Sequence, residues 1–360
     1  ASGILKHYVD DEILTIALDR YCDDGTFAEL NYDDCSRESG FPQKVHIYYL
    51  IYMATAFHNP SSPYYHSEVL KDKITKGLQF WVDHDFIADN WHSNEVTVPA
   101  GMTKLLFIFG NQLPPKLVEQ ARPIAGRANI NSWGARPSGD RVVIYGIYAK
   151  SLLYLNNRAE FEKVIELIKA EMKFSTGSRG LQHDFCFHHR HDRVNNTVSY
   201  GYGKFANTYG EWAYYTAGTK HQFPQEKINL LVDYYLNGIY KQLVYGVYPD
   251  VSALNRSISR EDEALFEPKE TLEIERILPL TNHRKAEMEE ILKLRSGAGG
   301  TASSFATFFW QTEHFVFQRP NFYTSVRMHS TRNKNMEVGY NGEGVTTHHR
   351  GDGANYVQQR

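Results

Sequence analysis

The sequence predicts a mainly α-helical protein, an (α/α) toroid or incomplete barrel with a short β-rich C-terminal region. Three observations support this prediction. Apolar residues recur at helical spacing in one segment after another up to about residue 295. Proline and glycine residues separate these segments. After the glycine-rich stretch 296–300, the pattern changes to short runs rich in aromatic and β-branched residues.

The predicted helices follow one another along the chain, each defined by apolar positions three or four residues apart. They cover residues 12–18, 45–57, 67–82, 103–109, 116–121, 141–155, 159–174, 204–216, 225–245 and 284–294. Paired helices of this length, joined by irregular loops, are typical of an α/α toroid whose loops build a cleft at one end. Residues 305–310, 314–318 and 323–328 have strand character, and Asn341-Gly342 predicts a hairpin turn. We therefore expect a catalytic toroid over residues 1–300 and a β-rich segment packed on it over residues 301–360.

Bulk composition narrows the functional classes. The chain has 39 basic and 42 acidic residues among 360, a net charge of −3. No overall positive field attracts polyanions, so we expect no nucleic-acid binding, and an anionic ligand must be held by local Arg and Lys side chains. No apolar run approaches membrane-spanning length, so we expect no membrane partner. The oligomeric state stays open.

The first residues and the cysteines bear on the compartment. The chain begins Ala-Ser-Gly without Met, which fits a processed secretory protein or a trimmed chain, and we expect a periplasmic or secreted protein. Cys22 and Cys35 could form a disulfide in an oxidising compartment or stay reduced, while Cys186 is expected to be free.

Four histidines, His183, His188, His189 and His191, fall within nine residues. The spacing of some of them would suit a metal ion, but no HExxH motif or cysteine pair accompanies them, so we predict no metal site and no cofactor. Ordinary hydrogen-bonding roles are expected for three of the four. His191 is the catalytic candidate because Tyr200 lies nine residues further on, and His189 is a candidate substrate-binding residue.

Tyr200 and Tyr202 lie in the run Ser-Tyr-Gly-Tyr-Gly, whose glycines allow a ligand to approach the backbone closely. Tyr200 is the catalytic candidate and Tyr202 a substrate-binding one, although either could be a packing residue. A phenol is a poor base at neutral pH unless a cation lies beside it. Arg256 and Arg260 are the candidate cations, and Arg is the preferred bidentate partner of a carboxylate. The alternative is a surface ion pair with Glu261, Asp262 or Glu263.

A His–Tyr–Arg set suits the removal of a carbon-bound proton next to a carboxylate. The histidine and tyrosine transfer protons, while a cation or amide stabilises the charge that develops on the carboxylate. Uronic-acid polysaccharides present such a proton, so a polysaccharide lyase is the leading hypothesis. A sugar-binding loop is predicted at Asn90, Trp91 and Asn94, with Trp91 as the ring that stacks on the sugar. The alternative is a turn that caps the following helix.

The sequence resembles the family 8 polysaccharide lyases, which include chondroitin AC, hyaluronate and xanthan lyases. Residues 317–332, followed by Asn335, Asn341-Gly-Glu343 and Gly351-Asp-Gly353, resemble the start of that family's β-sandwich region. The segment ending at His191 resembles the one that carries the family's catalytic histidine, with one residue extra. The resemblance implies catalytic roles for Tyr200 and Arg256 and substrate-binding roles for Arg260, Glu343 and the motif of Asn90, Trp91 and Asn94.

Two departures from the family pattern matter. The family places an asparagine, which neutralises the uronate carboxylate, where this chain has Asp140. Asp140 would then have to be protonated, or an amide such as Asn94 or Asn131 would take the role. The chain is also much shorter than family 8 enzymes, and its compactness resembles polysaccharide lyase family 38, which implies activity on alginate or glucuronan.

We therefore predict an endo-acting lyase that cleaves a 1,4-linked uronate polysaccharide, alginate or glucuronan, by β-elimination. Tyr200 or His191 removes the C5 proton, and Tyr200 protonates the departing O4. The anionic polysaccharide is the only partner expected. A chondroitin or hyaluronan lyase, a glycoside hydrolase on the same toroid, a non-catalytic uronan-binding protein and a metal-dependent enzyme are the alternatives.

Overall fold

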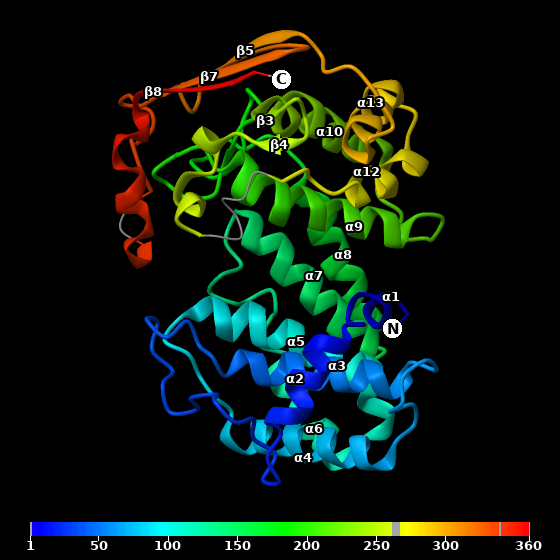
Figure 1. Cartoon of the computed structure of the whole chain (residues 1–360). Helices are drawn as coiled ribbons and strands as arrows, with labels where there is room; N and C mark the ends of the chain where they lie inside the picture. The colour runs from blue at the N-terminus through cyan, green and yellow to red at the C-terminus, as the bar shows by residue number, and fades with distance from the viewer. Residues whose placement is uncertain (1, 261–266, 338–339, 360) are drawn as a thin grey trace. The chain divides into compact units, whose positions relative to one another are not determined.

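The computed structural model describes residues 2–260, 267–337 and 340–359. The chain divides into two compact units (Figure 1). Unit 1 comprises Ala1–Ala135 and Ile144–Val164, and unit 2 comprises Arg136–Val143 and Ile165–Arg360. The predicted assignment of residues 1–300 to one catalytic domain stays a prediction. The predicted change from helix to strand is observed, since the last α-helix ends at Ser296 and the next strand begins at Phe305.

Unit 1 is helical. Its elements are α1 (Ser2–His7), α2 (Asp11–Arg20), α3 (Lys44–His58), α4 (Glu68–His84), the π-helix η1 (Ser93–Thr97), α5 (Val98–Phe109), η2 (Gly110–Gln112) and α6 (Pro115–Ala125). Both units contribute residues to α7 (Gly139–Tyr154) and α8 (Arg158–Glu171). Side chains cap two of these helices in the expected way: Asp10 accepts from the first turn of α2, and Ser67 from the first turn of α4.

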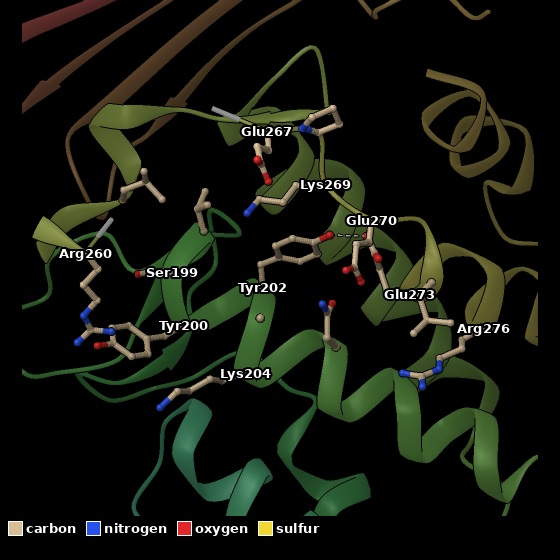
Figure 2. Close-up of a pocket in the computed structure, with 16 residues that line it drawn as sticks. Ser199, Tyr200, Tyr202, Lys204, Arg260, Glu267, Lys269, Glu270, Glu273 and Arg276 are labelled. Atoms are coloured by element: carbon tan, nitrogen blue, oxygen red, sulfur yellow. Dashed lines mark hydrogen bonds between the residues drawn. The ribbon is translucent and has the colours of Figure 1, made fainter. Parts of the chain in front are cut away.

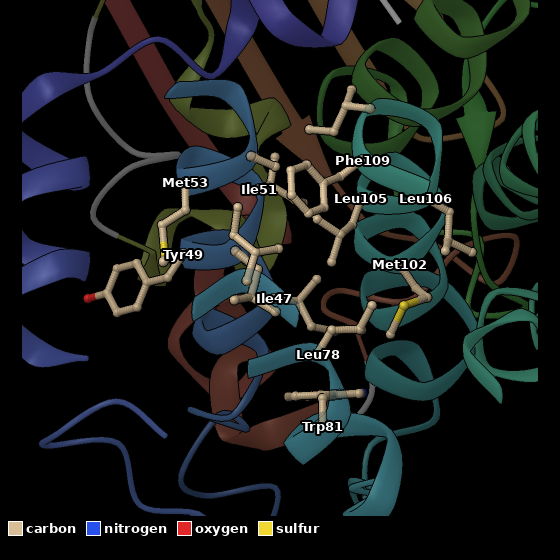
Figure 3. Close-up of a cluster of buried hydrophobic side chains, with 14 of the residues drawn as sticks. Ile47, Tyr49, Ile51, Met53, Leu78, Trp81, Met102, Leu105, Leu106 and Phe109 are labelled. Atoms are coloured by element: carbon tan, nitrogen blue, oxygen red, sulfur yellow. The ribbon is translucent and has the colours of Figure 1, made fainter. Parts of the chain in front are cut away.

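The core of unit 1 is apolar and lies where α3, α4 and α5 meet (Figure 3). Leu50 of α3, Leu78 and Trp81 of α4 and Met102 of α5 are each fully buried. The helices approach closely because Gly77 has no side chain: a Cβ there would lie 2.8 Å from the Leu50 side chain. Hydrophobic burial therefore accounts for most of the stability of this unit.

Unit 2 begins with the hairpin of β1 (Gly180–Leu181) and β2 (Phe187–His188). Helical segments follow: the π-helix η3 (Thr197–Ala206), α9 (Asn207–Thr216), α10 (Gln225–Tyr234), the π-helix η4 (Tyr235–Ile239) and η5 (Tyr240–Gln242). A second hairpin, β3 (Leu243–Val244) with β4 (Tyr248–Pro249), leads to η6 (Val251–Ala253), η7 (Asn255–Ser259), α12 (Leu272–Ile277), η8 (Leu278–Leu280) and α13 (Lys285–Ser296).

The prediction of one continuous helix over residues 225–245 is wrong. The α-helix ends at Tyr234, a π-helical turn follows, and the chain enters a strand at Leu243. Gly238 allows this change because its Cα packs against the Phe185 backbone, and a Cβ there would lie 2.2 Å from the Phe185 carbonyl oxygen. Apolar periodicity does not register such a close approach between segments far apart in sequence.

The C-terminal region of unit 2 is an antiparallel sheet in the order β5 (Phe305–Phe309), β6 (His314–Arg319), β7 (Phe322–Met328), β8 (Asp352–Gln359), seen as a single layer in Figure 1. The first three strands match their predicted positions. The fourth was missed, and the predicted turn at Asn341-Gly342 is wrong, because η9 (Tyr340–Gly351) occupies this stretch. The buried face of the sheet is unusually polar, with His314, Ser325 and Arg327 all buried.

Two smaller expectations can be compared with the structure. Cys22, Cys35 and Cys186 are all free thiols, so Cys22 and Cys35 are not paired. Among the described residues, each helix is too short or too polar to span a bilayer.

The core of unit 1 yields a first prediction. Leu78→Ala should lower the free energy of unfolding by about 2–5 kcal/mol, because a fully buried leucine leaves a cavity when truncated. Val69→Ala on the same helix removes a side chain that is 69% exposed, and it should change stability by no more than about 0.5 kcal/mol. Urea unfolding followed by circular dichroism measures both. Equal effects of the two variants would contradict the assignment of the α4 core face.

Candidate active site

Tyr200 is positioned by the π-helix η3. The backbone N–H groups of Tyr200 and Gly201 both donate to the Asn196 carbonyl, at 3.0 and 2.8 Å. Gly201 is required at this turn, because a Cβ there would lie 2.8 Å from the Phe187 side chain and closer still to the Tyr234 hydroxyl. π-Helical segments are rare, and they occur frequently at functional sites. Gly201 is therefore needed for packing against Phe187 and Tyr234 inside the protein.

The Tyr200 hydroxyl is held by Arg256, one of the two arginines predicted to lie beside it. Arg256 lies on η7 and donates from Nε at 2.9 Å and also from Nη2. Both side chains are buried. Two charge-assisted hydrogen bonds from a guanidinium stabilise negative charge on a phenolic oxygen. This pair can therefore support tyrosine as a proton acceptor.

Glu337, which was not among the predicted site residues, balances the charge of Arg256. Its carboxylate is fully buried and lies 3.5 Å from Arg256 Nε and 3.5 Å from Arg190 Nε. Asn196 Nδ2 donates to it at 3.0 Å. The signal was present, because Glu337 lies between Asn335 and Glu343 in the stretch that carried the family resemblance, but a lone glutamate gives no spacing to recognise.

Arg260 and Glu343 form the second ion pair. Arg260 Nε and Nη2 donate to the two carboxylate oxygens of Glu343 at 2.8 and 3.1 Å, and Arg256 Nη1 lies 3.6 Å from the same group. Burial opposes ionisation of Glu343, but Arg260 outweighs it and lowers the pKa of Glu343 below its ordinary value. The alternative partners proposed for the arginines, residues 261–263, lie outside the described residues.

His189, rather than His191, lies against Tyr200. Its ring stacks on the Tyr200 ring with centroids 4.0 Å apart and planes 8° apart. Burial lowers the pKa of His189 despite the nearby carboxylate of Asp140, so the ring is neutral at neutral pH. Nε2 faces Asp140 Oδ2 at 3.3 Å and carries the proton, which leaves a lone pair on Nδ1. Nδ1 has no hydrogen-bond partner among the described residues, so it can accept a proton.

Asp140 lies in the first turn of α7, where it forms an ion pair with Lys204 and contacts the neutral His189 ring, both in unit 2. Lys204 Nζ donates to its Oδ1 at 2.7 Å, and His189 faces its Oδ2. Burial alone would raise the pKa of Asp140, but Lys204 and His189 outweigh burial and lower it well below its ordinary value. Of the two alternatives for this position, a protonated Asp140 or an amide elsewhere, the protonated Asp140 is therefore wrong.

Two predicted site residues do not join the Tyr200 cluster. His191 is exposed, and its ring lies about 3.4 Å from the Arg179 guanidinium. Counting nine residues back from Tyr200 therefore selected the wrong histidine. The Tyr202 hydroxyl donates to Glu273 at 2.6 Å and accepts from Arg295 at 3.0 Å in a buried network.

The predicted sugar-binding loop belongs to unit 1. Trp91 packs edge-on against Trp133, with ring centroids 5.1 Å apart. Both amide atoms of Asn94 bond the backbone of Ala88, at 2.9 and 2.8 Å, and Asn90 accepts from the His92 backbone at 3.2 Å. Asn94 is therefore engaged in holding the turn and is not available as a carboxylate neutraliser. The exposed Trp133 was missed as the partner of Trp91.

A cavity of about 550 Å³ in unit 2 opens beside Tyr200 (Figure 2). Tyr200, Tyr202 and Lys204 all project from η3 along it, and Arg260, Lys269 and Glu273 line other parts of its wall. The mixture of cations and aromatic rings suits an anionic sugar. Within the described ranges, no group of three His, Cys, Asp or Glu side chains is arranged to hold a metal ion.

Comparisons with known proteins identify the family. The model for "Polysaccharide lyase family 8, N terminal alpha-helical domain" matches residues 27–296, and that for the super-sandwich domain of the same family matches residues 304–360. The expectation from length, family 38, is not the family found. Chain length did not indicate the family, because this chain spans about half the length of the relatives that it matches.

Individual relatives are similar to the chain over nearly its whole extent. Chondroitinase-AC of Pedobacter heparinus is 24% identical over 340 residues, which are 94% of this chain and 48% of that protein. A solved structure of chondroitinase AC lyase has a TM-score of 0.88 at 22% identity and covers 99% of this chain and 53% of its own. The structure of a Paenibacillus xanthan lyase has a TM-score of 0.78 at 15% identity. The match covers 99% of this chain and 37% of the xanthan lyase chain. These likenesses confirm the predicted fold class.

The buried glutamate yields a second prediction. Glu337→Gln should destabilise the protein by about 3–5 kcal/mol, because Arg256 and Arg190 then lose a buried counter-charge. Glu343→Gln alters a partly exposed ion pair and should cost about 1 kcal/mol or less. Urea titration of the two variants measures the difference. If both lost the same stability, Glu337 would not be the principal counter-charge of the cluster.

A third prediction concerns pH. Burial, with a contribution from Arg193, lowers the pKa of His188 from 6.5 to about 4. Between these values the unfolded chain binds a proton at His188 that the folded chain does not bind. The contribution of His188 to the free energy of unfolding is therefore fully present above pH 6.5, and it is lost as the pH falls toward 4. In urea titrations at stepped pH, His188→Gln should show a shallower loss of stability across this window and a pH dependence like wild type from pH 7 to 8. Parallel curves throughout would refute the assignment.

Proposed function

The chain belongs to polysaccharide lyase family 8, and on that premise we propose that its protein cleaves a 1,4-linked, uronate-containing glycosaminoglycan of the chondroitin type by β-elimination. The observation that carries the proposal is the arrangement at Tyr200. A phenolic oxygen accepts two hydrogen bonds from a buried arginine, and a neutral histidine ring lies flat against the same tyrosine. This arrangement suits proton transfer at carbon next to a carboxylate.

The proposed reaction needs only these side chains. The phenolate form of Tyr200, which the two hydrogen bonds from Arg256 stabilise, takes the C5 proton of the uronate. The electron pair forms the C4–C5 double bond, the C4–O4 bond breaks, and Tyr200 returns the proton to O4. In a 1,4-linked glucuronate the C5 hydrogen and O4 lie on one face of the ring, so one residue can perform both transfers. For a uronate with these groups on opposite faces, His189 Nδ1 is the base in place of the predicted His191. The reaction calls for no cofactor.

The relatives favour a glycosaminoglycan over the alginate or glucuronan first expected. The curated relative bears the name chondroitinase-AC, and its similarity extends over 94% of the chain. Alginate was expected because of the chain length and Asp140. Chain length does not indicate the substrate here, because the chain spans 48% of its relative. A polymer of this kind lies outside the cell, so we also propose a periplasmic or secreted location.

Ultraviolet absorbance in the unsaturated-uronate band tests the proposal. Chondroitin, hyaluronan, polymannuronate, polyguluronate and glucuronan are incubated separately with the protein, with and without chelator. We expect a rise on chondroitin that survives chelator. Reducing ends without a double bond would indicate a glycoside hydrolase. A rise on polymannuronate or glucuronan alone would overturn the substrate class but keep the reaction.

A fourth prediction concerns Tyr200. Tyr200→Phe should lower kcat by about 10²–10⁴-fold, because the variant lacks the group that transfers both protons. Tyr215→Phe is the matched control, since Tyr215 lies on the surface of α9, where its hydroxyl donates to Glu211 at 2.9 Å. Circular dichroism confirms that both variants fold. Normal turnover in Tyr200→Phe would exclude Tyr200 as the catalytic acid and base.

A further inference from the structure

Asp140 introduces a negative charge where an anionic substrate would react. Its carboxylate lies 3.3 Å from His189 Nε2, and His189 stacks on Tyr200. The low pKa of Asp140 means that it is ionised. An ionised carboxylate repels the carboxylate of a uronate, so Asp140 cannot by itself stabilise the charge that develops when the C5 proton leaves.

Lys204 supplies the missing positive charge. Its Nζ lies 2.7 Å from Asp140 Oδ1, so the pair is neutral overall. The two members differ in access: the Asp140 side chain is 8% exposed, whereas that of Lys204 is 29% exposed. Lys204 also lines the cavity of about 550 Å³ beside Tyr200. A ligand in that cavity therefore meets the cation of the pair, with the anion behind it.

The backbone places the cation next to the catalytic tyrosine. Lys204 follows Tyr200 by four residues on η3, and its Nζ lies 5.2 Å from the centre of the Tyr200 ring. The start of α7 approaches η3 closely because residue 139 is glycine: a Cβ there would lie 3.0 Å from both Lys204 Cβ and the Tyr200 carbonyl oxygen. This approach brings Asp140 against Lys204, and Figure 2 shows Tyr200 and Lys204 together at one end of the cavity.

We propose that Lys204 binds the carboxylate of the uronate and stabilises the charge that develops on it, while Asp140 acts as a positioning residue that holds Lys204 and His189. The inference rests on the proposed function and names the residue that neutralises the substrate. As the C5 proton passes to Tyr200, charge accumulates on the substrate carboxylate oxygens, and the Lys204 ammonium donates a hydrogen bond to them. No proton needs to leave Lys204, and the proton taken by Tyr200 returns to O4.

The other candidate groups fit this role less well. Arg256 is committed to the Tyr200 hydroxyl, and Arg260 makes two hydrogen bonds to Glu343. Asn94 uses both amide atoms on the Ala88 backbone. Lys204 combines positive charge, access to the cavity and proximity to the base.

Four proteins test the inference: wild type, Lys204→Gln, Asp140→Asn and the double variant. Lys204→Gln should lower kcat on chondroitin roughly 100-fold, with a smaller change in KM, because the lost interaction strengthens in the transition state. It also leaves Asp140 without its main counter-charge. The double variant should recover at least about tenfold over Lys204→Gln, because a neutral amide at residue 140 can donate to the substrate carboxylate. Lys293→Gln, which alters an exposed ion pair on α13, should match wild type.

A binding measurement gives a readout that does not depend on turnover. In the Tyr200→Phe background, calorimetry compares a chondroitin hexasaccharide with the same oligosaccharide after reduction of its carboxyl groups to alcohols. The native oligosaccharide should bind several-fold more tightly, and Lys204→Gln should remove that preference. A purely structural role for Lys204 would weaken both ligands equally.

The outcomes separate the two hypotheses. If wild type forms unsaturated product and Lys204→Gln keeps kcat within threefold, or if the double variant is no more active than Lys204→Gln, the role of Lys204 is wrong and the lyase stands. If wild type forms no unsaturated product from any of the five polymers, the proposed function fails and the inference fails with it.

Discussion

The buried charge of Arg256 is the constraint on which the site depends. A guanidinium removed from water costs several kcal/mol unless counter-charge and hydrogen-bond acceptors surround it. Tyr200 from η3 and Glu337 from the segment after the third sheet strand provide these partners. Because the three groups come from segments more than fifty residues apart, the charge cluster forms only when the C-terminal region has folded onto the helical part of unit 2. Assembly of the candidate site and tertiary folding are therefore coupled in this unit.

The sheet contributes to the site through its polar buried face. Tyr323 donates to Asp250 at 2.8 Å, Ser252 and Ser325 share a hydrogen bond of 2.9 Å, and Arg327 donates to the Ser252 carbonyl at 3.0 Å. Burial alone would raise the pKa of Asp250, but hydrogen bonds led by the one from His314 lower it to about 2. These directional contacts fix η6 and thereby the start of η7, which carries Arg256. Unit 1 differs, since its helices pack through apolar side chains that specify position less strictly.

Two of the π-helical segments, η3 and η4, share a physical role. In η3 the displaced hydrogen-bonding pattern brings both Tyr200 and Lys204 to the cavity, and in η4 it allows Gly238 to reach the Phe185 backbone. In both cases a glycine removes the side chain that would prevent the approach. Such turns replace an ordinary helical hydrogen bond with a less favourable one, and the packing that they permit compensates for this. Their positions depend on contacts with other segments.

The sequence by itself determined the helical class, the change to strands after residue 300, the family resemblance, and Tyr200 with its two candidate arginines, Arg256 and Arg260. Each of these depends on local periodicity or on a short run of residues. Only the tertiary structure decided that His189 rather than His191 meets Tyr200, that Glu337 balances Arg256 and that Lys204 offsets Asp140. The physical reason is that these contacts join distant segments, and both ring orientation and charge balance depend on burial. The sequence pattern identifies candidate residues, but it does not show which of them lie in contact in the folded protein.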